Sequence, residues 1–349
     1  DPGIPAARDY VLATMLDVVK RYDVDGIHID DYFYPYREVN TITRRVHGKR
    51  VRQTREIPFP DDKSWVKYGK AKGWTDRDAW RRANIDDFIH ALYTGTKALK
   101  PATLVGISPF GIWRSGTPRG ITGLDAYGEL YADSKRWLSE GWLDYLVPQL
   151  YWQVGGTEDR FRALDAWWRS ENPRGRYIWP GLYDAHIYGG RDPWPVGEIR
   201  NQLAFIRDSR AGTGDPSGEV HFRLSALFAE HDLVGATLAD AYGRLALVPA
   251  FPWLGGTAPA SPQVSIVSKD GAIVFSITPG DTVDVRWWLI QTRGRAGVWA
   301  SSLRPAGDGR LAASAFGTVD PDEIAVTAVG ATGMASAPTV VGANTELLR

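Results

Sequence analysis

The chain of 349 residues contains no cysteine. This absence excludes disulfide bonds, thiolate nucleophiles and metal sites with cysteine ligands. Histidine is also scarce, with six in the chain. These six show no His-x-x-x-His or similar ligand spacing, so we expect no metal and no cofactor. No hydrophobic run reaches the roughly 20 residues that a membrane span needs. The first residues, Asp-Pro-Gly, do not resemble a signal peptide.

An excess of charge of either sign is missing as well. Lys plus Arg and Asp plus Glu number 41 each, so the net charge is zero. No basic stripe argues for nucleic acid, and neither a Walker loop nor a Gly-x-Ser-x-Gly elbow is present. The chain is instead rich in Trp and Tyr, with 15 of each. Such rings fill cores, but they also form flat platforms for the apolar faces of sugars.

Strand-like and helix-like segments alternate along the first 250 residues. The predicted strands end near Asp30, Ser108, Tyr151, Leu182 and Leu224, and a helical pattern precedes or follows each of them. Residues 37–76 are polar, basic and without clear periodicity, so an irregular excursion is expected there. The expected helices lie at 4–22, 76–100 (with Thr75 as N-cap), 131–140, 159–170, 196–208 and 233–247.

This alternation predicts a parallel sheet in an α/β fold. Five strands in succession, with long loops after most of them, favour a (β/α)8 TIM-type barrel over a doubly wound sheet. Five strands are three fewer than eight, so we expect the chain to lack the first three β/α units. Pro, Gly, Ala and Thr dominate residues 249–262, which predicts a linker. We therefore expect a barrel over 1–254 and a β-sandwich over 255–349, with strands at 263–267, 272–277, 283–291, 296–301 and 323–328.

The strand Gly26–Asp30 carries the leading candidate for catalysis. Because side chains alternate across a strand, Ile27 and Ile29 should face the helices, while His28 and Asp30 should face the barrel interior. Asp30 would then lie at the strand end where barrel enzymes hold their active sites. A glycosidase needs such a carboxylate, either as a nucleophile or to stabilise an oxocarbenium-like centre. The neighbouring Asp31 could assist, although either aspartate could instead cap an element or pair with an arginine.

Other strand ends supply candidate sugar-binding groups. Gln149 and Tyr151 should face inward, with Trp152 beside them, because an amide can pair with hydroxyls while the rings stack on a sugar. Polar side chains at strand ends can equally serve their own loops, and an arginine in a loop is often only solvated. The full set of expected binding residues is His28, Tyr34, Ser108, Trp113, Arg114, Gln149, Tyr151 and Trp152.

A second carboxylate is harder to identify. Asp184 follows directly after a predicted strand and is the first candidate, with Asp125 and Glu129 as alternatives in neighbouring loops. Asp144 stands at the start of its strand, at the opposite end of the barrel, so we expect it to be structural. The separation of the two carboxylates, which distinguishes retaining from inverting mechanisms, cannot be read from a sequence.

Several longer motifs give the chain a family resemblance over residues 1–254. The motifs are Asp-Pro-Gly-Ile-Pro at 1–5, the aromatic and acidic run at 22–36, Trp-Arg-Arg-Ala-Asn at 80–84, Gly-Ile-Ser-Pro-Phe-Gly-Ile-Trp at 106–113, Leu-Tyr-Ala-Asp at 130–133, the segment 141–152 and Pro-Ala-Phe-Pro-Trp-Leu at 249–254. In these motifs the chain is similar to the bacterial glycosyl-hydrolase-like family 10, a group of extracytoplasmic barrel proteins that includes a peptidoglycan glycosidase acting on glycan strands without stem peptides.

The resemblance implies a (β/α)8 barrel, export from the cytoplasm and a polysaccharide substrate. In the family, the first strands precede the Asp-Pro-Gly motif, which agrees with the strand count. The leading hypothesis is a glycoside hydrolase that cleaves peptidoglycan or a related glycan with Asp30, Asp31 and Asp184, without nucleic-acid partners. Two alternatives stay open: a glycan-binding protein without catalysis and, less favoured, a metal-dependent deacetylase using His28, Asp30 and Asp31.

Overall fold

The computed structural model divides the chain into two compact units, Asp1–Ala241 and Tyr242–Arg349. The division comes earlier than the predicted one at residue 254. One reason is that the 249–254 segment bonds within the second unit, where the Phe251 amide donates to the Thr332 carbonyl at 2.8 Å. The structure describes all residues except 32, 48, 157–158, 190–191, 229–232, 244–245, 270–271, 295–296, 308, 313–321 and 343–349.

The first unit is built on a parallel sheet. Strands β1 (Gly26–Ile29), β4 (Leu104–Ile107), β5 (Tyr145–Leu146) and β6 (Tyr177–Ile178) are neighbours in that order, and all pairs are parallel. Strand β7 (Gly181–Tyr183) pairs in parallel with β8 (Val220–Phe222), and a parallel bridge from Gln149 to Gly181 links the two sets. The predicted mixed α/β class is thus confirmed. Over the described residues the strands do not close into a barrel.

One predicted strand, 177–182, is interrupted in the structure. It forms β6 and β7 with Trp179 and Pro180 between them. Proline has no N–H to donate to a neighbouring strand, which explains the break. The consequence is that the two halves face different neighbours, since β6 pairs with β5 and β7 pairs with β8.

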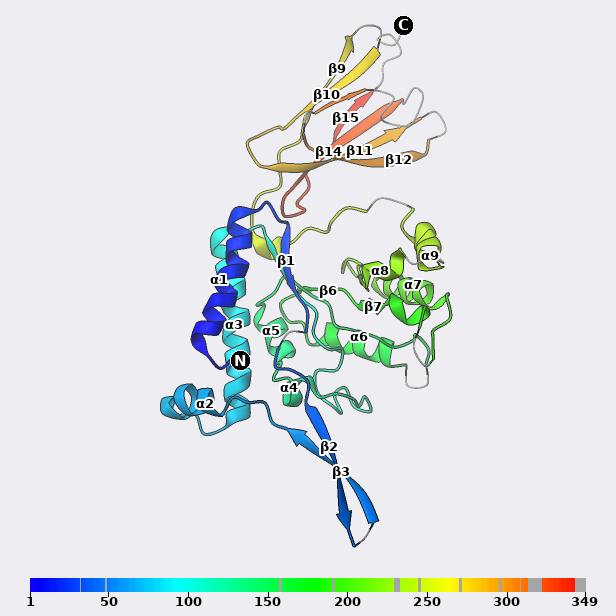
Figure 1. Cartoon of the computed structure of the whole chain (residues 1–349). Coiled ribbons are helices and arrows are strands. Elements are labelled where there is room, and N and C mark those ends of the chain that lie inside the picture. The colour runs from blue at the N-terminus through cyan, green and yellow to red at the C-terminus, as the bar shows by residue number, and fades with distance from the viewer. Residues whose placement is uncertain are drawn as a thin grey trace. The chain divides into compact units, whose positions relative to one another are not determined.

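Helices occupy the connections between the strands. In Figure 1, α1 and α3 lie side by side. Asp76 caps α3 by accepting from the amides of Asp78 and Ala79, so the predicted cap at Thr75 was wrong by one residue. The bounds are α1 (Pro5–Arg21), α2 (Asp62–Ser64), η1 (Trp65–Gly69), η2 (Lys70–Lys72), α3 (Arg77–Leu99), α4 (Ala126–Glu129), α5 (Ser134–Glu140), α6 (Arg160–Ser170), η3 (Asp184–Ile187), α7 (Glu198–Arg210), α8 (Leu224–Leu227) and α9 (Leu233–Ala241).

The core of this unit lies between the parallel sheet and its helices. On α6, Phe161, Leu164 and Trp168 recur at helical spacing and are fully buried. They join Trp137 of α5 and the strand residues in one cluster. Burial of such large side chains supplies the main stabilisation of the sheet's position. No helix among the described residues has the length and apolar character to cross a membrane.

The basic segment 37–76 is more regular than expected. It contains a β-hairpin of two nine-residue strands, β2 (Glu38–Val46) and β3 (Lys49–Ile57), followed by the short helices α2, η1 and η2. The prediction failed because period-2 alternation of polar and apolar residues marks only a strand with one buried face. Here every side chain of β3 is exposed, so no such alternation exists.

The second unit contains two antiparallel sheets. Their orders are β13-β10-β9 and β12-β11-β14-β15. Phe275 of β10, Trp288 of β11 and Val326 of β14 are buried in one cluster, so the two sheets share a core. The bounds are η4 (Pro252–Leu254), β9 (Gln263–Lys269), β10 (Ala272–Thr278), β11 (Val285–Arg293), β12 (Trp299–Pro305), β13 (Arg310–Ala312), β14 (Glu323–Gly330) and β15 (Thr339–Gly342), of which β13 and β15 were not predicted.

Candidate functional site

A carboxylate and an amide meet where two parallel strands end. Asp30 directly follows β1, and its Oδ1 accepts a hydrogen bond of 3.0 Å from Nε2 of Gln149. The same amide nitrogen lies 3.3 Å from the Ser108 carbonyl oxygen. Gly111 permits this arrangement, because a Cβ at that position would lie 2.3 Å from the Gln149 carbonyl oxygen. Asp30 and Gln149, which sequence analysis placed on the same face, do come together.

His28 lies two residues before Asp30, so the two side chains are on the same face of the strand. Its Nε2 is 2.7 Å from Ser108 Oγ, and its Nδ1 is 3.2 Å from the hydroxyl of Tyr145. The imidazole also stacks on Tyr145, with ring centroids 5.6 Å apart. Burial of the ring lowers the pKa of His28, which favours the neutral form. These contacts join the imidazole to Ser108, which follows β4, and to Tyr145 of β5.

The pKa of Asp30 is raised above its ordinary value. Burial is the largest cause, and the negative charge of Asp31 is the second. Hydrogen bonds from the Asp31 amide and from Gln149 act in the opposite direction. Asp31 itself accepts a hydrogen bond of 3.1 Å from the Tyr36 hydroxyl. The two adjacent carboxylates therefore have different side-chain donors, which are Gln149 for Asp30 and Tyr36 for Asp31.

Removal of the Asp31 charge should lower the pKa of Asp30. In an Asp31→Asn variant the repulsion disappears while the Asp31 amide and Gln149 still donate, so the Asp30 carboxyl should titrate at lower pH than in the wild-type protein. Carboxyl-detected NMR titration measures this shift. Asp9→Asn, which removes an exposed carboxylate on α1, is the control and should leave the Asp30 titration unchanged. An Asp30 pKa that stays constant or rises in Asp31→Asn contradicts the assigned coupling.

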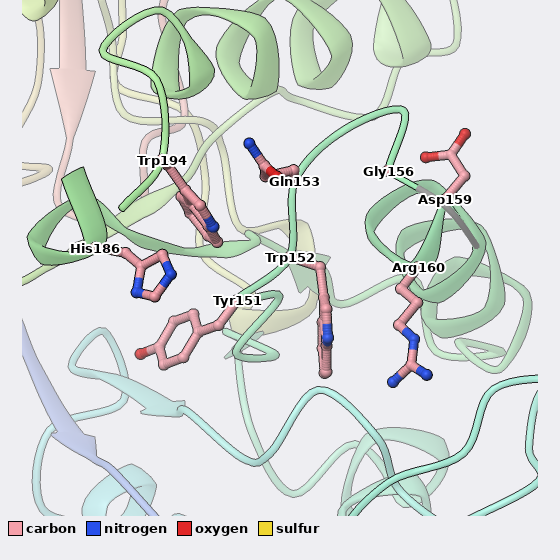
Figure 2. Close-up of a pocket in the computed structure, with 8 residues that line it drawn as sticks. All are labelled: Tyr151, Trp152, Gln153, Gly156, Asp159, Arg160, His186 and Trp194. Carbon is pink, nitrogen blue, oxygen red and sulfur yellow. The ribbon is translucent and has the colours of Figure 1, made fainter. Parts of the chain in front are cut away.

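An aromatic pocket opens next to this strand end (Figure 2). Its volume is about 460 Å³. In the figure, Trp152 lies between Tyr151 and the guanidinium of Arg160, which is 5.9 Å from the centroid of the indole ring. His186 and Trp194 form the other side, with ring centroids 4.7 Å apart. The described lining residues are Tyr151, Trp152, Gln153, Gly156, Asp159, Arg160, His186 and Trp194.

Tyr151 connects the pocket with the carboxylates. Burial raises its pKa, and the charges of Asp30 and Asp31 raise it further, so its hydroxyl is protonated and able to donate. Its ring stacks on Phe222 and packs against Tyr183, with centroids 5.9 Å and 5.0 Å away. A ligand in the pocket would therefore meet aromatic faces and a hydroxyl within the electrostatic reach of both carboxylates.

Two residues of α7 hold the loop that carries Trp152. Glu198 Oε1 accepts from the Val154 amide at 2.8 Å, and Gln202 Nε2 donates to the Trp152 carbonyl at 3.1 Å. Both side chains are buried, and burial raises the pKa of Glu198. Sequence analysis missed them, along with Arg160, His186 and Trp194. They come from two helices, from η3 and from the loop before α7, and no local sequence pattern places them beside Trp152.

Tyr34 and Asp184 have environments that differ from those expected. Tyr34 is 2% exposed and packs edge-on against Phe59 and Tyr131. It also lines a second cavity, of about 430 Å³, so its role in sugar binding stays a prediction. Asp184 is fully buried, and its carboxylate contacts Nδ1 of His221 at 2.9 Å. A buried carboxylate in such a contact orients the imidazole and is not open to a substrate.

The remaining predicted residues contact other parts of the first unit. Trp113 donates to Asp133 at 3.0 Å and packs against Tyr127, and the Arg114 guanidinium lies 5.1 Å from the centroid of the same Tyr127 ring. Neither has a contact with Asp30 or Asp31 among those found for the described residues. Of the other carboxylates, Asp125 caps α4, Glu129 accepts from the Asp125 amide at 3.2 Å, and Asp144 is buried against Lys97 at 2.6 Å, as expected for a structural residue.

Metal chemistry was the least favoured alternative for His28, Asp30 and Asp31. Among the residues that the structure describes, no three His, Asp or Glu side chains are grouped so that they could hold a metal ion. Nδ1 and Nε2 of His28 instead face Tyr145 and Ser108. The described site is thus a carboxylate, an amide and an aromatic pocket.

A match to a known family model shows to which family the chain belongs. The model of the family described as glycosyl hydrolase-like 10 matches residues 1–189, which is more than half of the chain and includes β1, Asp30 and Gln149. The chain belongs to the glycosyl hydrolase-like 10 family. The resemblance noted in the sequence is thereby confirmed, and the family name supports a hydrolase that acts on glycans.

Two relatives of this glycosyl hydrolase-like 10 protein carry names of the same kind. Glycosyl hydrolase YngK of Bacillus subtilis (strain 168) is 35% identical over 286 residues, which cover 77% of this chain and 50% of YngK. Glycosyl hydrolase DigH of Escherichia coli (strain K12) is 37% identical over 172 residues, which cover 48% of this chain and 35% of DigH. The chain thus spans half or less of the length of these curated relatives.

A solved structure also matches at low similarity. It is the chitinase ChiW from Paenibacillus sp. str. FPU-7, a cell-surface-expressed multi-modular enzyme, with 13% identity and a TM-score of 0.40. The match covers 97% of this chain and 44% of the chitinase chain. A likeness at this level supports no inference about the fold or activity of the glycosyl hydrolase-like 10 protein.

Proposed function

We propose that this chain carries the catalytic carboxylate of a glycoside hydrolase that cleaves a bacterial cell-wall glycan, with peptidoglycan strands free of stem peptides as the substrate. The observation that carries the proposal is the Asp30–Gln149 pair, which joins the chain after β1 to the chain after β5. Family membership supports the reaction class. The aromatic pocket supports a sugar substrate, since sugars bind to aromatic faces and to a few fixed polar groups.

In this proposal each residue has a defined role. Asp30 attacks the anomeric carbon or stabilises the positive charge that develops there, and it must be ionised to do so. Burial and the charge of Asp31 raise its pKa, so the reaction requires a pH above that pKa. Asp31 and His28 support it, while Gln149 orients its carboxylate. Tyr151 and Trp152 bind the sugar. For Asp184 we replace the predicted catalytic role by that of holding His221.

The proposal extends to the architecture around the site. The parallel strands β1, β4, β5, β6/β7 and β8 would belong to a (β/α)8 barrel, which explains why the candidate residues gather at strand ends. The two antiparallel sheets of the second unit would form a fibronectin-type or related β-sandwich. A cell-wall substrate would also require an extracytoplasmic location.

The test is the release of sugar fragments by the purified protein. Insoluble peptidoglycan stripped of stem peptides is incubated with the protein, and soluble reducing ends are measured over time. We expect continuous release that chelation of divalent metals does not change. Retention of the protein on the polymer without release would favour a non-catalytic binding protein. Liberation of acetate in place of sugar fragments would favour a deacetylase.

A further inference from the structure

The hairpin β2–β3 is a separate two-stranded sheet with a strongly basic composition. It pairs with no other strand among the described residues, and Figure 1 shows it extending away from the helices of the first unit. Residues 40–55 contain six Lys or Arg and no Asp or Glu, although the whole chain has a net charge of zero. Since every side chain of β3 is exposed, the hairpin has no core to explain this composition.

The strand register sorts the charges onto two faces. Arg45 is directly opposite Arg50, and Thr43 is opposite Arg52, so three arginines share one face of the ribbon. Like charges at directly opposed positions destabilise a strand pair. The ion pair found within the described hairpin region joins Arg37 to Glu56 near the base, away from these three. The outer part of the hairpin therefore carries a self-repelling cluster that bound anions would relieve.

The other face carries the remaining cations. Arg44, Lys49 and Arg55 alternate with the first three along the strands. Successive residues on one face of a strand lie roughly 7 Å apart. The ribbon thus presents cations at each of its four outermost residue pairs, on alternating faces, and once more at Arg55 nearer the base. This arrangement suits an extended anionic polymer better than a single small anion.

The base of the hairpin is continuous with the candidate site. Tyr36, two residues before β2, donates to the Asp31 carboxylate at 3.1 Å. Tyr36 also lines a second cavity, of about 430 Å³, together with Glu38 and Ile57 from the two strand ends and with Arg81. A polymer bound along the ribbon would therefore lead toward the Asp30–Asp31 strand end.

We propose that the β2–β3 hairpin binds an acidic polysaccharide, a glycan that carries regularly spaced carboxylates, and holds it beside the end of β1. Arginine recognises carboxylates through a rigid fork of two parallel N–H donors. The continuity with a site that we assign to glycan cleavage favours a glycan over a lipid surface or a polyphosphate. In that choice of occupant the inference rests on the proposed function, while binding by the hairpin is measurable without catalysis.

The test compares two triple variants that remove the same net charge. The first is Arg45→Gln, Arg50→Gln, Arg52→Gln on the hairpin. The control, Lys63→Gln, Lys67→Gln, Lys70→Gln, changes three exposed cations in the helical segment that follows. Binding of polygalacturonate, a polymer of carboxylated sugars, is measured by calorimetry with the Asp30→Asn protein, so that cleavage plays no part. Circular dichroism and urea unfolding verify the fold of each variant.

The hairpin variant should bind polygalacturonate at least about tenfold more weakly, the loss expected from three exposed charge contacts, while the control changes less than about twofold. Added salt should weaken wild-type binding, and the methyl-esterified polymer should not bind. A second hairpin variant, Arg44→Gln, Lys49→Gln, Arg55→Gln, should also lose affinity. Equal losses in hairpin and control variants, or tighter binding of polyphosphate or phosphatidylglycerol vesicles than of polygalacturonate, would overturn the proposal. Loss of sugar release with intact polygalacturonate binding would reject only the proposed hydrolase function.

Discussion

An Asp30→Asn variant should lose at least about 10²-fold in kcat for release of sugar fragments, because a catalytic carboxylate typically contributes this much or more. Asparagine keeps the size of the side chain, and its carbonyl oxygen can still accept from Gln149, so the geometry that joins the two strand ends should remain. What disappears is the negative charge and the nucleophile. KM should change much less than kcat, since binding depends on Tyr151 and Trp152.

In this experiment the reducing ends are assayed across a range of substrate concentrations. Asp9→Asn, on the exposed side of α1, is the matched control and should retain wild-type kinetics. The raised pKa of Asp30 also gives the wild-type protein a direction of pH dependence: activity should fall on the acid side as Asp30 becomes protonated. A folded Asp30→Asn variant that keeps most of its kcat would remove Asp30 from the mechanism.

The second large effect concerns stability. Replacement of Arg210 by Met should reduce the free energy of unfolding by about 3–5 kcal/mol, because it leaves the buried Asp165 carboxylate without its partner. Arg210 Nη2 donates to Asp165 Oδ1 at 2.8 Å and lies 3.3 Å from the Ile178 carbonyl oxygen. Both side chains of the ion pair are 1% exposed. The pair therefore ties α6 and α7 to the end of β6.

A matched control is available on the same helix. Arg200 of α7 pairs with Asp240, but the two side chains are 58% and 83% exposed, so Arg200→Met should cost less than about 1 kcal/mol. The double variant Asp165→Leu, Arg210→Met should recover much of the stability, because no unpaired buried charge remains. Urea unfolding of all four proteins gives the comparison. Equal losses for Arg210→Met and Arg200→Met would show that the buried pair has no special role.

Alternation along single strands allowed part of the site to be predicted. Because side chains on a strand alternate, His28, Asp30 and Gln149 could be assigned to one face, and the structure does bring His28 to Ser108 and Asp30 to Gln149. These assignments needed only local sequence and the order of the strands. The family resemblance, which the comparisons confirm, rested on motifs in the same segments.

Environments that distant segments determine could not be predicted from the sequence. Tyr34 stands in an aromatic run that follows Asp30, and Phe59 and Tyr131 pack edge-on against its ring. Asp184 follows a strand, but it is His221, 37 residues later, that occupies its carboxylate. The basic hairpin was missed because neither of its faces is buried, so its sequence lacks the apolar alternation that marks most strands.

A crystal structure of the Asp30→Asn protein with a bound peptidoglycan oligosaccharide tests the assignment of Asp30 as the catalytic carboxylate. This assignment predicts that the substituted side chain at position 30 lies about 3–3.5 Å from the anomeric carbon of the scissile bond, as a near-attack geometry requires, with a sugar ring against Trp152. An oligosaccharide whose scissile bond lies beside a different carboxylate, with the side chain at position 30 out of contact, would contradict it.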